Sequence, residues 1–540
     1  MLVGITLLVS AASCFHHAPA LTRPGQSLPA MSSSTSQRLC VAPHHPCVQT
    51  RILARQHVRA EVKSTESSSA DECLVDDTNC AVAEELMDTK MSSLGVSWFQ
   101  AMMVVFVLLV YAADGTEVAV MALVSRELAK KFSLTAGQIA LLGSSVYTGM
   151  FTGGLIAGPI ADTKGRSFTL VNACLLISLF GVASAYAPNF ALLCVLRFIC
   201  GVGMGASLPV SSSLLQETVP YNWKGALACL VFAGFNIGEL FAAKMGVLAF
   251  ARADPSKWLF LVAAIPAVVT YAVSLLVPES PRFLAARNEA DKVGAWFKRA
   301  AALNRKPIEE VFPEGLEEGA AKLAYEPPEE KKMRKRDALK AKLTDIFEPG
   351  GLRLRTAVLW VLWMAANSCF YGMIFSLPAA LRHVKVVAAQ PAFDVARGIA
   401  SVSAYQTIAF LLYMPLVALG VQYKTLFPIT FVGAFAALSS ALLATFGLFG
   451  QTLTPGRLVV SLAIAKFFYN GIFMMLYPLT GASYPTAIRA TGVALAGVAG
   501  RICTIMVAPV CTRLQQISPL LPYQAFTGIT GVAILASLLL

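Results

Sequence analysis

The sequence predicts an all-α membrane protein with twelve transmembrane helices, on three observations. Of its 540 residues, 56% are hydrophobic and only 14% are charged, whereas a soluble domain of this length would expose far more charge. Apolar windows of about 20 residues recur twelve times from Trp98 onward, and each can cross roughly 30 Å of hydrocarbon as a helix. The windows are continuous rather than alternating, which excludes a membrane-spanning β-barrel.

Residues 1–60 are predicted to be a targeting leader. Residues 2–14, LVGITLLVSAASC, form an apolar run of signal-peptide length that ends in small residues. The following segment contains Arg, Ser and Pro, and no Asp or Glu occurs before Glu61. Together they resemble the two-part leader of proteins sent to plastids acquired by secondary endosymbiosis. The alternative is an ordinary secretory signal with a disordered tail. Residues 61–97 are acidic and polar, and are predicted to be disordered.

The first bundle is predicted over residues 98–277. Its six windows lie at 98–124, 137–161, 168–186, 190–215, 225–249 and 258–277. The joint between the second and third windows is short and highly charged, because Asp162, Lys164 and Arg166 interrupt two apolar segments.

Each residue type at this joint suits a tight hinge between two helices. Gly158 allows close backbone approach, and Gly165 permits the turn. Asp162 pairs with a cation or caps the next helix. Arg166 can bind a carboxylate or the carbonyl groups at a helix end, and Glu217 with Lys224 is expected to join the same network.

A polar segment over 278–355 follows, and we expect it to contain amphipathic helices. Its apolar residues fall on one face, as a helix on a membrane surface requires: Leu284, Val293, Trp296, Phe297 and Leu303. Cationic loops remain on the cytoplasmic side, so the basic run at 331–342 predicts a cytoplasmic loop, or a stromal one in a plastid. Such a run beside a membrane contacts anionic headgroups rather than nucleic acid.

The second bundle is predicted over residues 356–540, as a repeat of the first. Its windows lie at 356–381, 398–420, 425–447, 456–480, 489–511 and 523–540. Arg197 precedes a proline by twelve residues, and Lys466 does the same in the second half. A proline also precedes Lys224 and Arg489 by four residues. These matches predict two pseudo-symmetric six-helix bundles around a central cavity.

Charges inside the apolar windows mark the candidate site. Asp114 and Glu117 lie three residues apart in the first window, on one helix face. A charge at the bilayer centre costs roughly 2.5–3.5 kcal/mol, so the two need a purpose or a partner, and Arg197 is the natural partner. The alternative is a static salt bridge that holds two helices together.

Further polar and aromatic residues are candidates for lining the cavity. They are Asn236, Glu239, Lys244, Tyr371, Lys466, Tyr469, Asn470 and Arg501. Glu239 and Lys244 could form a pair, and Lys466 would suit an anionic substrate if the repeat places it at the cavity. A structural tether or ordinary packing is the alternative for each.

Enzymatic and cofactor chemistry finds no support. Five of the six histidines precede residue 58, His383 stands alone, and the cysteines in the windows have no paired spacing. The G-x-x-x-x-G-K-[ST] phosphate loop of ATP-driven pumps is missing from the sequence. We therefore expect no metal, no cofactor and no enzyme activity.

Four motifs carry a resemblance to a known family. GPIADTKGR at 158–166 resembles the G-x-x-x-D-x-x-G-R loop signature of the major facilitator superfamily. The Arg197–Gly225 segment resembles the helix-four pattern of sugar porters and organic-ion transporters, and PESPRFL at 278–284 resembles the end of their first half. YPTAIRATG at 484–492 resembles the synaptic-vesicle-glycoprotein-like and organic-ion branch. The resemblance covers about 98–540.

The resemblance implies a major facilitator fold and roles for the charged residues. The loop charges would latch the outward-facing state, with Arg489 as the second-half cation. Glu117 would bind and release H⁺, Asp114 would tune its pKa and Arg197 would be the counter-ion. The second-half counterpart at 420–426 lacks the Asp and the Gly-Arg pair, so the latch should be lopsided.

We therefore expect a secondary active transporter of a small organic solute, embedded as a monomer in a lipid bilayer. Proton-coupled symport of an organic anion, such as an aromatic monocarboxylate, is the first expectation. The alternatives are a uniporter for sugars or organic cations and a transport-inactive receptor or scaffold that binds partners through 278–355.

Overall fold

The computed structural model describes residues 69–324, 351–383, 396–406, 413, 423–445, 455–484 and 489–539. These residues belong to one compact unit. The predicted leader at 1–60 and the basic run at 331–342 lie outside the described residues.

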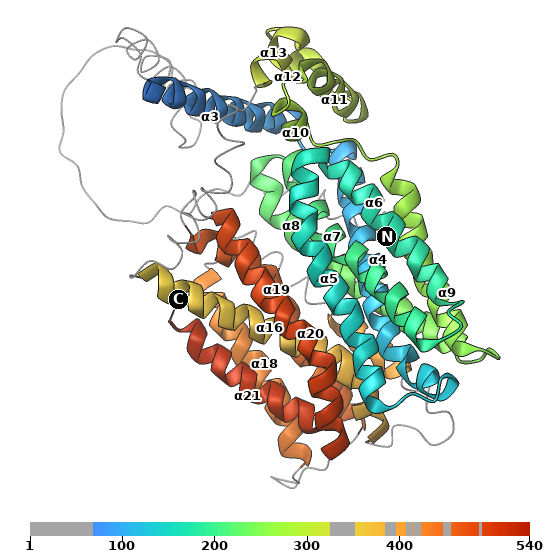
Figure 1. The fold of residues 1–540 in the computed structure, drawn as a ribbon. Coiled ribbons are helices and arrows are strands. Elements are labelled where there is room, and N and C mark those ends of the chain that lie inside the picture. Colours follow the sequence, from blue (N-terminus) through green and yellow to red (C-terminus); the bar gives the residue numbers. More distant parts are fainter. Residues whose placement is uncertain are drawn as a thin grey trace, which may run out of the picture. The chain divides into compact units, whose positions relative to one another are not determined.

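Every regular element in the described part of the chain is a helix, in agreement with the predicted all-α class (Figure 1). The first half contains α4 (Trp98–Lys131), α5 (Ala136–Lys164), α6 (Arg166–Ser184), α7 (Phe190–Thr218), the 3₁₀ turn η2 (Tyr221–Trp223), α8 (Lys224–Ala249) and α9 (Pro255–Ser274). The second half contains α16 (Gly351–His383), α18 (Tyr423–Thr445), α19 (Pro455–Ser483), α20 (Arg489–Ile517) and α21 (Leu521–Ser537).

Eleven of the twelve predicted windows coincide with these long helices. Ten helices of the described residues are long and apolar enough to cross a membrane, and α21 falls just short with 17 residues. The predicted window 398–420 is helical at 396–406, and most of its remainder lies outside the described residues. Large apolar side chains such as Val268 and Leu535 point outward from the spans, as hydrocarbon surroundings require.

Glycines bring pairs of helices in the first half into backbone contact. A Cβ atom on Gly149 or Gly153 of α5 would overlap the carbonyl oxygen of Phe198 or Val202 on α7. Gly115 of α4 and Gly238 of α8 abut each other's helices in the same manner. Small residues drive such close packing where lipid offers no hydrophobic gain, so α4, α5, α7 and α8 form the framework of this half.

The described part of the polar segment, up to residue 324, is largely helical. It contains α10 (Pro281–Ala285), α11 (Ala290–Leu303), α12 (Ile308–Val311) and α13 (Leu316–Leu323). The apolar face predicted for a membrane surface is instead covered by protein, because the Trp296 ring contacts Phe99 at 5.0 Å and Phe297 contacts Phe312 at 5.1 Å. Of the predicted residues on that face, Leu303 is exposed.

The expectation of a disordered tail at 61–97 is wrong for most of its length. Residues Ser69–Leu94 form helix α3, whose Met87 and Met91 are buried. Lys90 Nζ lies 2.7 Å from Glu314 Oε1, and Lys306 Nζ donates to the Ser93 carbonyl at 2.5 Å. The acidic composition predicted disorder because the partners that stabilise this helix lie between 136 and 224 positions away in the sequence.

Candidate functional site

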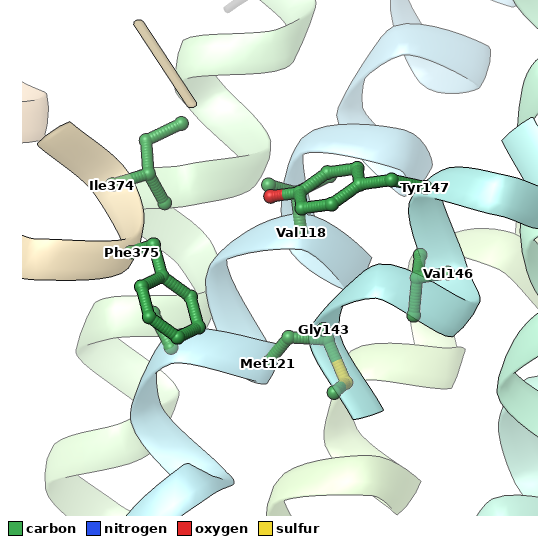
Figure 2. A pocket seen from close by; sticks show the side chains of 8 residues that line it. Val118, Met121, Gly143, Val146, Tyr147, Ile374 and Phe375 are labelled. Carbon is green, nitrogen blue, oxygen red and sulfur yellow. The ribbon is translucent and has the colours of Figure 1, made fainter. Parts of the chain in front are cut away.

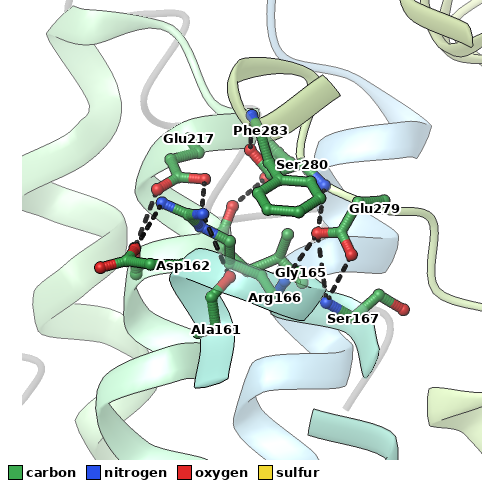
Figure 3. Close-up of polar contacts among 12 residues, drawn as sticks. Ala161, Asp162, Gly165, Arg166, Ser167, Glu217, Glu279, Ser280 and Phe283 are labelled. Atoms are coloured by element: carbon green, nitrogen blue, oxygen red, sulfur yellow. Dashed lines mark hydrogen bonds and ion pairs between the residues drawn. The ribbon is translucent and has the colours of Figure 1, made fainter. Parts of the chain in front are cut away.

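The charged joint between α5 and α6 is a network built around Arg166 (Figure 3). Arg166 lies 3.3 Å from Glu217 on α7 and 3.5 Å from Asp162, and it donates to the Ala161 carbonyl at 3.3 Å. Arg166 is thus shared between two acids and a helix C-terminal carbonyl. All of these partners belong to the first half, so the network braces that half internally.

Glu279, which was not among the predicted site residues, completes this network. Its Oε1 accepts from the Arg166 backbone N–H at 2.8 Å and its Oε2 from that of Ser167 at 3.1 Å (Figure 3). A carboxylate at a helix N-terminus satisfies orphan donors and opposes the positive end of the helix dipole. The PESPRFL motif contained this residue, but its partners lie about 113 positions earlier.

The structure places the remaining predicted latch residues as follows. Gly165 has φ +108°, so it permits the turn as expected. A Cβ atom on Gly158 would meet no described atom within 4 Å, so the expected close approach occurs at other glycines. Lys224 lies 3.2 Å from Asp88 of α3. The Arg489 side chain and the 420–422 loop lie outside the described part of the chain.

Glu117 and Arg197 form a buried ion pair inside the first half. Arg197 donates from one terminal nitrogen to Glu117 Oε2 at 2.7 Å, and both side chains are 1% exposed. Arg197 also donates to Ser184 Oγ at 2.9 Å and lies over the Phe260 ring at 4.9 Å. Glu117 Oε1 has no hydrogen-bond partner among the described residues. One carboxylate oxygen is therefore available to accept a proton.

Asp114 lies almost one turn earlier on α4, and is fully buried. Its Oδ2 accepts from Ser207 Oγ of α7 at 3.0 Å, whereas its Oδ1 has no partner in the part of the chain that the structure describes. Helix α4 thus carries two buried acids, of which Glu117 alone forms an ion pair among the described residues. A second buried carboxylate without a cationic contact is costly unless it is protonated or meets a ligand.

A second buried ion pair connects the two halves. Lys466 Nζ of α19 lies 3.0 Å from Glu239 Oε2 and 3.2 Å from Oε1 of α8. Gln406 Nε2 also donates to this carboxylate, and Ser403 Oγ lies 3.5 Å away. Asn470 Nδ2 is 3.4 Å from Gln406 Oε1. Glu239, Lys466 and Asn470 therefore form one polar cluster at the interface between the halves, and their role in a cavity stays a prediction.

Aromatic side chains from both halves adjoin this cluster. The Phe370 ring contacts Phe235, Phe473 and Tyr371 at 5.7, 5.1 and 5.4 Å between ring centroids. Tyr371 in turn contacts Tyr147 of α5 at 5.5 Å. Lys466 Nζ lies 5.7 Å from the Phe370 centroid. The predicted candidate Tyr371 thus lies between the halves.

An apolar pocket extends from Tyr147 between the two halves. It is lined by α4, α5 and α16, and its free volume is about 10 Å³, roughly the room for one water molecule. Figure 2 shows Ile374 and Phe375 on one side, with Met121 and Tyr147 on the other. In this conformation the pocket is therefore too small to hold an organic solute, and the halves would have to separate to admit one.

Four other predicted cavity residues have different surroundings. Lys244 is exposed and does not pair with Glu239. Tyr469 is buried within the second half, where its hydroxyl contacts Thr530 at 2.5 Å.

Arg501 of α20 contacts α5 of the first half. A Cβ atom added to Gly154 of α5 would overlap the Arg501 guanidinium, so the two residues face each other across the halves. Asn236 is fully buried, and neither of its amide atoms has a hydrogen-bond partner among the described residues.

Comparisons with known proteins agree with this architecture. The 4-hydroxybenzoate transporter PcaK of Pseudomonas putida is 28% identical over 403 residues, which cover 74% of this chain and 82% of that protein. The synaptic vesicle 2-related protein of Bos taurus is 25% identical over 466 residues, which cover 84% and 80%.

A solved structure shares the fold. The partially occluded inward-open conformation of the xylose transporter XylE from E. coli matches with a TM-score of 0.61 at 16% identity, over 81% of this chain and 98% of that chain. The family described as sugar (and other) transporter matches residues 95–539. The chain is therefore a multi-pass membrane protein that belongs to the sugar (and other) transporter family of the major facilitator superfamily.

Proposed function

We propose that this transporter carries an aromatic monocarboxylate together with a proton. The observation that carries the proposal is the pair of buried acids on α4. Glu117 holds Arg197 through one oxygen, and its other oxygen, like one oxygen of Asp114, has no partner among the described residues. Two acids with a single arginine contact form a group that can gain a proton without losing all of its partners.

Protonation at Glu117 Oε1 would weaken its attraction for Arg197. The proton comes from the aqueous side and neutralises the carboxylate, while Arg197 keeps its hydrogen bond to Ser184. Because the pair joins α4 to α7 and, through Ser184, to α6, its charge state can change how these helices pack.

Two features support an aromatic carboxylate as cargo. Aromatic rings and the cationic side chains Lys466 and Arg501 lie between the halves. A relative of the chain is named a 4-hydroxybenzoate transporter, and that compound combines a ring with a carboxylate.

Uptake into proteoliposomes tests the proposal. With an inward proton gradient, wild-type protein should accumulate labelled 4-hydroxybenzoate, benzoate or nicotinate above the external concentration. Glu117→Gln should abolish accumulation but retain exchange of internal for external substrate, because only net proton movement requires the acid. Unchanged accumulation by Glu117→Gln would reject its role in coupling.

The same assay separates the alternatives. A uniporter for sugars or organic cations would equilibrate xylose or tetraethylammonium at a rate independent of the gradient. A transport-inactive receptor would show no flux across the whole panel, and the exposed surface of α11–α13 would then be the place to search for partners.

We also propose that the protein resides in a plastid envelope membrane, on the resemblance of residues 1–60 to a two-part leader. A fluorescent protein fused after residue 60 should enter plastids in an alga with secondary plastids. Retention in the endoplasmic reticulum or delivery to the cell surface would favour an ordinary secretory signal.

A further inference from the structure

The Glu239–Lys466 pair differs from the Glu117–Arg197 pair in its position. It joins α8 of the first half to α19 of the second, whereas Glu117 and Arg197 both belong to the first half. Both side chains of the Glu239–Lys466 pair are at most 2% exposed. An ion pair across an interface that must open for transport has to be broken in each cycle.

The groups around the Glu239 carboxylate have the composition of an anion site. Lys466 supplies a cation within 3.2 Å of both carboxylate oxygens, and Gln406 donates an amide hydrogen bond. A cation with neighbouring amide donors is the arrangement that recognises a free carboxylate. Here the protein's own side chain occupies that arrangement.

Aromatic rings adjoin the same cation. Lys466 Nζ lies 5.7 Å from the Phe370 centroid, and Phe235 and Phe473 contact that ring. A benzoate-like ligand with its carboxylate on Lys466 would therefore have its ring beside Phe370 and its neighbours. Edge-to-face packing at these distances favours a flat aromatic ligand.

We propose that Glu239 is an internal substitute for the substrate, and that an aromatic carboxylate displaces it from Lys466. This inference rests on the proposed function for the identity of the ligand. Ligand binding replaces one carboxylate–ammonium contact by another, while Gln406 and Ser403 remain as donors to Glu239. The contact between the halves is thereby exchanged for a contact with cargo, which frees α8 to move relative to α19.

Ligand binding to the purified full-length protein tests whether an aromatic carboxylate displaces Glu239 from Lys466. The probes are 4-hydroxybenzoate and its uncharged analogue 4-hydroxybenzamide, measured by calorimetry in detergent. In Glu239→Gln, Lys466 is no longer neutralised, so 4-hydroxybenzoate should bind about tenfold more tightly. Affinity for the amide should stay the same, because it carries no charge.

A second variant keeps the test decisive if an unpaired buried lysine impairs folding. The double variant Glu239→Gln with Lys466→Gln removes both charges of this buried pair. It should lose the preference for carboxylate over amide. Lys244→Gln is the matched control, because it removes an exposed lysine from the same helix as Glu239, and its preference should equal that of wild type.

The outcomes separate this inference from the proposed function. If wild type, Glu239→Gln and the double variant all prefer the carboxylate over the amide equally, then Glu239 is no substitute for the substrate. The Glu239–Lys466 pair would then be a structural tether. If the variants change carboxylate binding as expected but the protein shows no uptake into proteoliposomes, transport is rejected. The displacement of Glu239 by the ligand is then still supported. A wild-type protein that binds neither probe, and accumulates neither benzoate nor nicotinate in proteoliposomes, would reject both.

Discussion

Gly165 is a position where one residue decides the geometry of the charged joint. Its φ of +108° is rarely adopted by other residues, and a Cβ atom there would overlap the Glu279 carboxylate. The turn, the cap on α6 and the place of Arg166 therefore all depend on a residue without a side chain.

Replacing Gly165 by alanine should destabilise the protein by about 1–3 kcal/mol, because the backbone is strained and Glu279 is pushed from the start of α6. Thermal unfolding in detergent measures the effect. The matched control is Gly158→Ala, since that position is helical and a Cβ atom would meet no described atom within 4 Å. Equal melting temperatures for the two variants would contradict this interpretation.

Individual charged residues were easy to identify in the sequence, but most of their partners were not. An ionisable residue in an apolar window is conspicuous, so Asp114, Glu117, Glu239 and Lys466 were all candidates. The choice of partner depends on how helices pack: Lys466 bonds to Glu239 across 227 positions, and the nearer Lys244 does not. Periodicity within one helix contains no information about that choice.

At the scale of elements, α3 fastens the polar segment to the first half. Asp88 lies 2.5 Å from Arg282 and 3.2 Å from Lys224, which joins α3 to α10 and to the start of α8. Lys90 and Glu314 join it to the α12–α13 region. These contacts are partly exposed, so each is expected to be modest.

Asp88→Asn should loosen α3 without affecting the spans, because it removes two ion pairs and no apolar contact. Hydrogen–deuterium exchange should speed up in α3 and α10 and stay unchanged in α5 and α7. Glu318→Gln is the control, because its pair with Lys322 is exposed on both sides. Equal exchange in α3 of wild type and Asp88→Asn would show that the apolar contacts suffice.

Acidification should weaken the same attachment through Glu314. Partial burial opposes the shift, but the hydrogen bond from Lys90 lowers the pKa of Glu314 below its ordinary value. Its contribution is therefore present above the unfolded pKa of about 4.3 and is lost as the pH falls through the lower, folded value. Exchange in α3, relative to the intrinsic rate at each pH from about pH 6 to about pH 3, checks this, with Glu314→Gln expected to respond less to acidification than wild type.

The helices themselves could be predicted because continuous apolar windows admit few alternatives in a membrane. The ends were less accurate where a helix continues beyond the hydrocarbon, as at α4, which runs to Lys131 rather than 124. The polar helices α3 and α11 depend on burial against distant parts of the chain, so their composition alone indicated a tail and a membrane-surface helix.

At the scale of the whole molecule, α5 and α20 form a broad contact between the halves. Ser144 Oγ donates to the Ile505 carbonyl at 2.9 Å, and a Cβ atom on Gly143 would lie 2.9 Å from that of Ala508. Alternating access requires the halves to rock against each other, so this contact should separate in one part of the cycle.

A disulfide between Gly143→Cys and Ala508→Cys should therefore stop uptake. The usual Cβ–Cβ distance of about 3.8 Å needs only a small shift of the two helices. Oxidation should abolish uptake into proteoliposomes and a reductant should restore it, while each single cysteine variant stays active. Full uptake with the cross-link formed would show that α5 and α20 move together.

The glycine contacts between α5 and α7 have a practical consequence for anyone who follows this protein by spectroscopy. With no side chains separating the two backbones at Gly149 and Gly153, the helices can hardly shift independently. Probes attached to the lipid-facing surfaces of both should keep a constant spacing throughout turnover. That spacing offers an internal ruler, against which displacements of any other part can be calibrated.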